Sequence, residues 1–151
     1  CISAPYITEF SIKNIVSNVI SQCDEKAKKA GVTIYFDCKD DYIVSSDKTK
    51  FECALINIIF NAIEACKNGC RINIICRKDN DKIITTIKND GEKIPENVIP
   101  RIFDIDFTTK KNGNGLGLAI CKSQLEAAGA SIYLLSSDDK ETIFEIVLSL
   151  K

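Results

Sequence analysis

The sequence predicts an α/β protein, a two-layer sandwich in which helices pack on one face of a mixed sheet. Three observations support this fold class. Helical and strand-like patterns alternate along the 151 residues, several short runs are rich in β-branched residues, and three segments carry apolar residues at helical spacing. A hydrophobic content of 45% and a net charge of −1 suit one globular domain over residues 1–151.

The chain begins with a helical pattern. Apolar residues recur every three or four positions over residues 12–27, and Gly31 ends this predicted helix. A strand-like run over residues 32–38 follows, and then a short extended piece over residues 42–45. The first helix should therefore pack beside an early strand of the sheet.

The second predicted helix begins after Asp47, whose side chain is expected to cap it, and ends near Asn68-Gly69. Two β-branched runs, residues 71–77 and 82–88, come next. The polar turn at residues 78–81 joins them, which predicts a hairpin.

Residues 89–112 show no clear periodicity and form a long connection before the third predicted helix. Two prolines and two phenylalanines within it favour an ordered lid, with a merely flexible loop as the alternative. The third helix should cover residues 116–128 and end at a glycine. Two final strands are predicted at residues 132–136 and 142–150.

Composition excludes several function classes. A balanced charge gives no basic surface for nucleic acid, and the longest apolar stretch, residues 54–63, is too short to span a bilayer. The 8 cysteines include no CxxC pair and the chain has no histidine, so we expect reduced thiols in a cytosolic protein and no zinc set. Because methionine is absent, we expect a piece of a longer protein.

The segment KKNGNGLGLA places glycines at 113, 115 and 117 directly before a helical pattern. Glycines before a helix N-terminus can bring backbone N–H groups close to an anion such as phosphate, although they also occur in ordinary loops. The spacing fits neither the Rossmann fingerprint nor the P-loop, and without histidine the protein kinase signature also fails.

Two other polar groups stand out. Asn57, Asn61, Glu64 and Asn68 fall on one face of the second helix. Asparagine is a poor helix former, so this face is either a solvated surface or a source of oxygen ligands for Mg²⁺. The second hairpin strand ends in Asn89-Asp90-Gly91, which is either an ordinary turn or an acceptor presented to a pocket.

In this order, the motifs resemble the catalytic ATP-binding domain of bacterial sensor histidine kinases, members of the GHKL superfamily with the Bergerat fold. The similarity covers nearly the whole chain and rests on four boxes. The asparagine box matches DKTKF with LINIIFNAIEA, the first glycine box NDGEKIP, the phenylalanine box RIFDIDFTTK, and the second glycine box GNGLGLAI. The resemblance implies a mainly antiparallel mixed sheet covered on one face by three helices, with an ATP lid at residues 89–115.

The resemblance also implies the site residues. Asn61 would hold the Mg²⁺ that bridges the ATP phosphates, Asn57 would support it, and Lys110 would reach toward the phosphates. Asn89 falls where the family places an aspartate that recognises adenine, and its amide oxygen can still accept a hydrogen bond. The nucleotide-binding set implied by the family is Asn57, Asn61, Asn89, Gly91, Ile94, Lys110, Gly113, Gly115, Leu116, Gly117, Leu118 and Thr142.

As a histidine kinase domain, the chain would bind Mg·ATP and donate the γ-phosphate to a histidine on a separate dimerisation domain. It would be cytoplasmic and signal to a response regulator receiver domain, with no nucleic-acid partner and no insertion into a membrane. The ATPase branches of the superfamily carry a glutamate base at the position of Asn57, and an amide cannot serve as that base. Glu64, one turn beyond Asn61, is a poor substitute. An ATP-hydrolysing clamp and a non-catalytic nucleotide-binding domain are the alternatives.

Three departures from the family pattern concern the lid and the last turn. Lys93 replaces the usual second glycine of the first glycine box, and Ile105 replaces a frequent proline. Residues 138–141 lack the late glycines of many members. These differences bear on nucleotide affinity more than on the fold.

Overall fold

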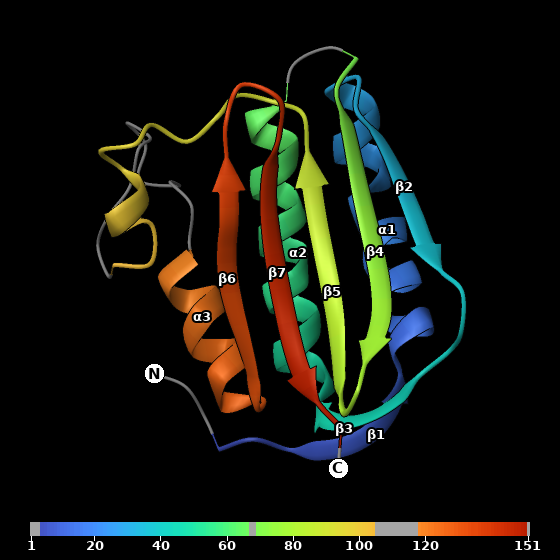
Figure 1. Cartoon of the computed structure of the whole chain (residues 1–151). Helices are drawn as coiled ribbons and strands as arrows, with labels where there is room; N and C mark the ends of the chain where they lie inside the picture. Colours follow the sequence, from blue (N-terminus) through green and yellow to red (C-terminus); the bar gives the residue numbers. More distant parts are fainter. Residues whose placement is uncertain (1–3, 67–68, 105–117, 151) are drawn as a thin grey trace.

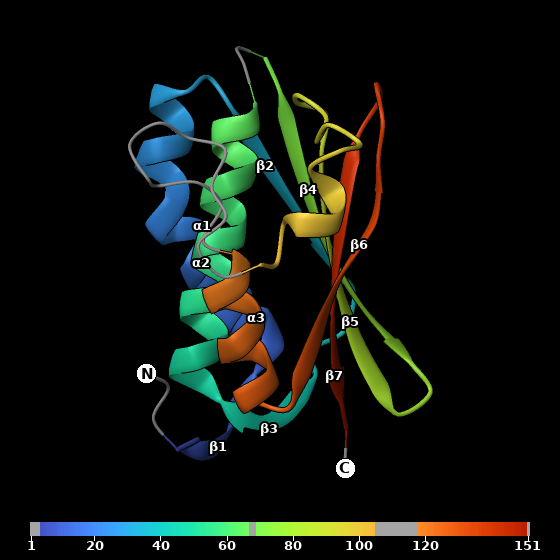
Figure 2. The same cartoon turned by 90° about the vertical axis from the view of Figure 1, so that its left-hand side faces the viewer.

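The computed structural model describes residues 4–66, 69–104 and 118–150. Figure 1 shows a sheet with its helices behind it, and Figure 2 shows from the side that these helices lie on one face. Among the described helices, none is long and apolar enough to cross a bilayer. The elements in chain order are β1 (Ile7–Ser11), α1 (Ile12–Lys29), β2 (Thr33–Cys38), β3 (Ile43–Asp47), α2 (Lys48–Ala65), β4 (Arg71–Asp79), β5 (Lys82–Asn89), the 3₁₀ turn η1 (Ile99–Arg101), α3 (Leu118–Ala127), β6 (Ala130–Ser137) and β7 (Thr142–Ser149).

The main sheet has five strands in the order β2-β4-β5-β7-β6. Only β2 and β4 run parallel, and the other three pairs are antiparallel. The expected mixed, mainly antiparallel sheet with three helices on one face is therefore confirmed. The β4–β5 hairpin turns at Asn80, which has a positive φ of 56°, a conformation that asparagine tolerates better than most residues.

The core lies between the sheet and the helices. On β4, residues Ile72, Ile74 and Cys76 are buried toward the helices, because alternate side chains of a strand point to the same face. The apolar side of α2 packs against this face with Phe51, Leu55, Ile58, Ile59 and Ile63 all buried. These contacts fix the rotation of α2, and so fix where its asparagines lie.

A second, two-stranded sheet joins β1 to β3. The sequence predicted the extended piece that becomes β3 but missed β1. Only Phe10 is buried in β1, so the strand has almost no apolar pattern of its own and depends on pairing with β3. Strand formation by such a segment is a tertiary effect.

Asp47 caps α2 as predicted. Its Oδ1 accepts the backbone N–H of Lys50 at 3.1 Å, and its Oδ2 accepts that of Tyr6 at 2.8 Å. Burial alone would raise the pKa of Asp47, but these two hydrogen bonds and the nearby Lys50 ammonium outweigh burial and lower the pKa. The ionised carboxylate thus joins the start of α2 to the chain before β1.

Asp47→Asn should lower the free energy of unfolding by about 1 kcal/mol near neutral pH, because an amide replaces a charged acceptor of two N–H groups. The folded-state pKa lies below the ordinary 3.8, so the carboxylate contributes stability above that pH and loses it as pH falls through the folded value. Urea unfolding of both proteins at about pH 7 and about pH 3 checks this. An Asp47→Asn deficit that stays constant over this range would contradict it.

Two expectations about the end of α2 are wrong. The helix ends at Ala65, with Cys66 as an extended C-cap, instead of near Asn68-Gly69. Cys66 and Cys70 form a disulfide with their Cα atoms 5.4 Å apart, whereas reduced thiols were expected throughout. The extended backbone at Cys66 redirects the chain after α2 and lets Cys66 reach Cys70, just before β4. Their spacing is not that of a CxxC pair, so the motif search did not indicate a bond. The free cysteines among the described residues are Cys23, Cys38, Cys53, Cys76 and Cys121.

Candidate functional site

The helix α2 packs between α1 and α3 (Figure 2), and its polar face carries Asn57 and Asn61. Both asparagines are half-buried and lie one turn apart. The thiol of Cys121 on α3 donates to the Ala54 carbonyl at 3.6 Å and lies near the Asn57 amide. Burial raises the pKa of Cys121 to about 11, and the Asn57 amide offsets part of that effect. The neutral thiol thus joins α3 to α2 close to Asn57.

Glu64 belongs to the same helix but takes part in an ion pair with α1. Its carboxylate lies 3.3 Å from Lys26 Nζ, which also sits 4.9 Å from the centre of the Phe60 ring. The ion pair ties α2 to α1 and directs the Glu64 carboxylate toward Lys26.

The end of β5 presents a buried carboxamide. Asn89 is 4% exposed, and its Oδ1 accepts the backbone N–H of Gly91 at 3.1 Å. An amide oxygen has two lone pairs, so this bond leaves room for a second donor. Asp90 turns the other way, toward β4, where its Oδ1 accepts the Arg71 N–H at 2.6 Å. The Asx-type bond and the Asp90 contact hold the Asn89-Asp90-Gly91 turn in one conformation.

Gly91 brings this turn against the end of α2. A Cβ at position 91 would meet the carbonyl oxygen of Ala65, and would lie 2.8 Å from the Ala65 carbonyl carbon and 2.9 Å from Cys66 Cα. The Glu92 N–H donates to the same Ala65 oxygen at 2.8 Å. Only glycine permits this approach, so the turn is built directly onto the helix that carries the asparagines.

A second buried polar group stands opposite Asn89. Thr142 is 2% exposed and pairs with Asn89 in the β5–β7 register. Its Oγ1 lies 2.7 Å from Ser137 Oγ, which accepts the Ile94 N–H at 2.8 Å. The predicted residues Asn89, Gly91, Ile94 and Thr142 therefore come together at one end of the sheet. Ser137 was missed, because nothing in the local β6 sequence distinguishes it from an ordinary strand-end serine.

Two of the departures from the family pattern meet in space. Lys93 Nζ lies 3.1 Å from the Asp139 carboxylate in the turn between β6 and β7. Both side chains are exposed, so the pair contributes little to stability. It nevertheless links the start of the lid to the turn next to Ser137 and Thr142.

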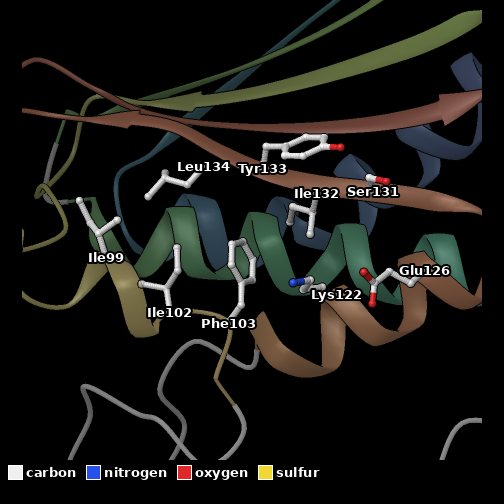
Figure 3. Close-up of a pocket in the computed structure, with 9 residues that line it drawn as sticks. All are labelled: Ile99, Ile102, Phe103, Lys122, Glu126, Ser131, Ile132, Tyr133 and Leu134. Carbon is white, nitrogen blue, oxygen red and sulfur yellow. The ribbon is translucent and has the colours of Figure 1, made fainter.

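A separate pocket of about 450 Å³ lies between η1, α3 and β6. Figure 3 shows Ile99, Ile102 and Phe103 facing Leu134 and Lys122 across it. The Lys122 ammonium sits 5.5 Å from the centre of the Phe103 ring. Ile99, Ile102 and Phe103 belong to the predicted lid, and none of the described lining residues is in the predicted nucleotide-binding set.

Several predicted site residues lie outside the described part of the chain. These are Lys110, Gly113, Gly115, Leu116 and Gly117, together with residues 105–115 of the lid. The described part of the predicted lid runs to Asp104 and includes η1 and the buried Ile102. Leu118 opens α3 and is buried in the core, so any ligand contact there would come from its backbone.

A protein-family model described as histidine kinase-, DNA gyrase B-, and HSP90-like ATPase matches residues 46–151. Sporulation kinase A of Bacillus subtilis (strain 168) is 31% identical over 90% of the chain. Sensor histidine kinase ZraS of Salmonella typhimurium is 26% identical over 91% of it. The chain spans 23% and 30% of these two relatives' own lengths, which is less than a third of each.

Solved structures agree with the fold. The catalytic domain of histidine kinase ThkA, in a nucleotide-free form, superposes with a TM-score of 0.86 at 31% identity, covering 95% of both chains. The histidine kinase ThkA in complex with the response regulator protein TrrA gives a TM-score of 0.82 at 28% identity. That match covers 96% of this chain and 42% of the other.

Proposed function

The chain belongs to the histidine kinase-, DNA gyrase B- and HSP90-like ATPase family, as a domain like the catalytic domains of sensor histidine kinases, and we propose that it binds Mg·ATP and donates the γ-phosphate to a histidine of a separate dimerisation domain. The observation that carries the proposal is the buried polar cluster of Asn89 and Thr142, set beside a helix whose polar face is built from asparagines. A cluster of this kind at the end of a sheet suits a ligand with both donors and acceptors.

Adenine is the proposed ligand of this cluster. The second lone pair of Asn89 Oδ1 would accept a hydrogen bond from the exocyclic amino group, while the Gly91 N–H keeps the amide oriented. Thr142, held by Ser137, would contribute a hydroxyl at the same end. Ile94 would add an apolar contact, because its N–H is already bonded to Ser137.

The phosphates would extend toward α2 and the start of α3. Asn61 fits Mg²⁺ because an amide oxygen is a hard neutral ligand, and Asn57, close to Cys121, would support the phosphate shell. Bound Mg²⁺ would neutralise phosphate charge during transfer. Lys110, Gly113, Gly115, Leu116, Gly117 and Leu118 would supply the remaining phosphate contacts, with residues 89–115 as the lid.

The α2 face offers no suitable general base for water, and this favours phosphoryl transfer over ATP hydrolysis. Asn57 has no useful basicity, and the Glu64 carboxylate is engaged by Lys26 at 3.3 Å. Transfer to an imidazole needs no general base here, because the neutral ring nitrogen is already a nucleophile. The residues on this face would position and neutralise the phosphates while another domain supplies the acceptor.

The acceptor domain and the next partner lie outside this chain. The sequence contains no histidine, so the phosphate must leave on another domain, which we propose is a histidine-containing dimerisation domain of the same protein. A structure of histidine kinase ThkA contains the response regulator protein TrrA, and we propose a receiver domain of that type as the later acceptor. The reaction would take place in the cytoplasm.

A transfer assay tests the proposal. The 151-residue chain is mixed with γ-labelled ATP, Mg²⁺ and histidine-containing dimerisation modules, and label on the module is measured beside free phosphate. We expect labelled module and little free phosphate. Steady phosphate release without any acceptor would make the chain a hydrolase, and absence of both products despite bound ATP would make it a binding domain. Either result would overturn the kinase assignment.

Asn89→Ala should weaken ATP binding by about 10-fold, since one hydrogen bond to a buried partner is worth about 1.4 kcal/mol. Asn89→Asp keeps the acceptor and should keep most of the affinity. Titration with a fluorescent adenine nucleotide measures both, with a guanine nucleotide as the specificity control. Equal affinity in Asn89→Ala and the parent chain would remove Asn89 from the adenine site.

A further inference from the structure

We propose that Cys66 and Cys70 form a reversible thiol–disulfide site, addressed by low-molecular-weight thiols and disulfides, whose state controls how firmly the turn after β5 is held against α2. The site lies where the end of α2, the start of β4 and the end of β5 come together, at the upper edge of the view in Figure 1. The Sγ atoms of both cysteines and a carboxylate oxygen of Asp90 lie within 4.8 Å of one another.

Backbone hydrogen bonds anchor each of the two cysteines to a neighbouring element. The Cys66 N–H donates to Ile63 O at 3.1 Å, which fixes it to the last turn of α2. The Cys70 carbonyl accepts the Thr33 N–H at 3.2 Å, which fixes it to β2. Two sulfurs anchored in this way can bond or separate with little movement of the chain, so both states belong to the folded protein.

The ring that the bond closes is too short to be a major structural brace. The two cysteines are separated by 4 positions, and the entropy that a disulfide removes from the unfolded chain grows with the length of the loop it closes. Both cysteines belong to the core cluster, which contains many further buried residues from the helices and the sheet. Reduction should therefore leave the domain folded.

Cys66 and Cys70 are 8% and 7% exposed, and four of the five described free cysteines are buried as well. Burial raises the pKa of Cys23 to about 11 and that of Cys76 to about 12, and it also raises the pKa values of Cys38 and Cys121. Thiols with such pKa values remain protonated and react slowly, because the thiolate is the nucleophile. Cys53 is the exposed exception among the described free cysteines, and it serves as an internal reference.

The disulfide is connected to the turn that we assign to adenine. The backbone of Ala65 and Cys66 forms the surface on which Gly91 rests, and the Glu92 N–H bonds Ala65 O. On the other side, Asp90 bonds the Arg71 N–H, next to Cys70. Both ends of the disulfide therefore hold neighbours of Asn89, and its opening would loosen the turn. This coupling step rests on the proposed function.

The chemistry is thiol–disulfide exchange with a small disulfide, RSSR. The thiolate of one cysteine attacks RSSR and forms a mixed disulfide, and RS⁻ leaves with the electron pair of the broken bond. The second thiolate then attacks the sulfur of the first cysteine, which closes the Cys66–Cys70 bond and releases a second RS⁻. The pair loses two electrons and two protons, and RSSR becomes two RSH. Excess RSH reverses both steps.

The first test follows the cysteines themselves. The folded chain is equilibrated in buffers with graded ratios of a small dithiol to its oxidised form, quenched with acid and alkylated, and each cysteine is measured by mass spectrometry. We expect Cys66 and Cys70 to change together at one midpoint while circular dichroism stays native, with Cys53 alkylated throughout. A pair that stays bonded until the fold is lost, or stays free in excess oxidant, would overturn the proposal. The proposal would also be overturned if the reduced cysteines bound Zn²⁺ and the bound ion blocked their reoxidation.

The second test measures the coupling. The fluorescent nucleotide should bind the reduced chain at least about 5-fold more weakly than the oxidised chain. Cys66→Ser and Cys70→Ser should each show the weaker value in both buffers, and Cys53→Ser should respond as the parent does. Equal affinities in the two states would overturn the coupling. If neither state bound nucleotide, the proposed function would fail and the coupling with it, whereas the alkylation result would stand.

Discussion

Asn61→Ala should abolish most transfer activity, with a loss on the order of 100-fold or more in labelled acceptor, because it removes the proposed metal ligand at the phosphate end of the site. The side chain is half-buried on a helix whose rotation is fixed by a packed apolar face. The position of Asn61 along the helix and its direction are therefore fixed. Initial rates of transfer at saturating ATP and at varied Mg²⁺ measure the effect.

Asn73→Ala is the matched control. Asn73 is also a half-buried asparagine, but it lies on β4 between Ile72 and Ile74, and these two are buried toward the helices. It thus projects from the opposite face of the sheet. The same chemical change there should leave transfer unaltered. If Asn61→Ala kept full activity and the same Mg²⁺ dependence, Asn61 would hold no metal. If activity is lost, a melting temperature of Asn61→Ala near that of the parent chain would exclude misfolding as the cause.

The fold was predictable because most helices and strands have a clear pattern in their own local sequence. The helices α1 and α2 have apolar residues at helical spacing, and the β4–β5 hairpin combines two β-branched runs with a polar turn. The same local logic located Asn89, because a polar side chain at the end of a buried strand followed by glycine indicates a tight turn. Its meeting with Thr142 was implied by the family resemblance and required the strand order to be seen.

The features that escaped prediction depend on contacts between distant segments. The strand β1 forms because β3 is beside it, and Ser137 matters only because Ile94 and Thr142 reach it from two other segments. The disulfide depends on the extended cap at Cys66, which redirects the chain after α2. None of these leaves a periodic signal in the residues concerned, so pattern reasoning could not find them.

The glycines at 113, 115 and 117 remain a prediction, since they lie outside the described residues. Among the described residues, a different glycine has a clear structural role. Gly91 joins the turn that carries Asn89 to the end of α2, and so connects the adenine end of the proposed site to the helix with the proposed metal ligand. This close backbone contact helps to set the distance between the two proposed parts of the site.

Gly91→Ala should therefore reduce both stability and nucleotide binding. The new methyl group would overlap the carbonyl oxygen of Ala65 and approach the Ala65 carbonyl carbon to 2.8 Å. These are backbone atoms near a helix end, and they cannot rotate away as a side chain can. We expect a loss of about 1–3 kcal/mol in the free energy of unfolding, typical of overpacking, and ATP binding at least about 10-fold weaker as the turn is displaced.

Gly129→Ala separates the two effects. Gly129 lies in the turn between α3 and β6 with a φ of +82°, and a Cβ there would meet nothing within 4 Å. Alanine should cost about 1 kcal/mol through its left-handed backbone while leaving nucleotide binding unchanged. Urea unfolding and nucleotide titration of both variants, at a temperature where each is folded, provide the comparison. A folded Gly91→Ala chain that bound ATP as tightly as Gly129→Ala would show that the contact with Ala65 does not position Asn89.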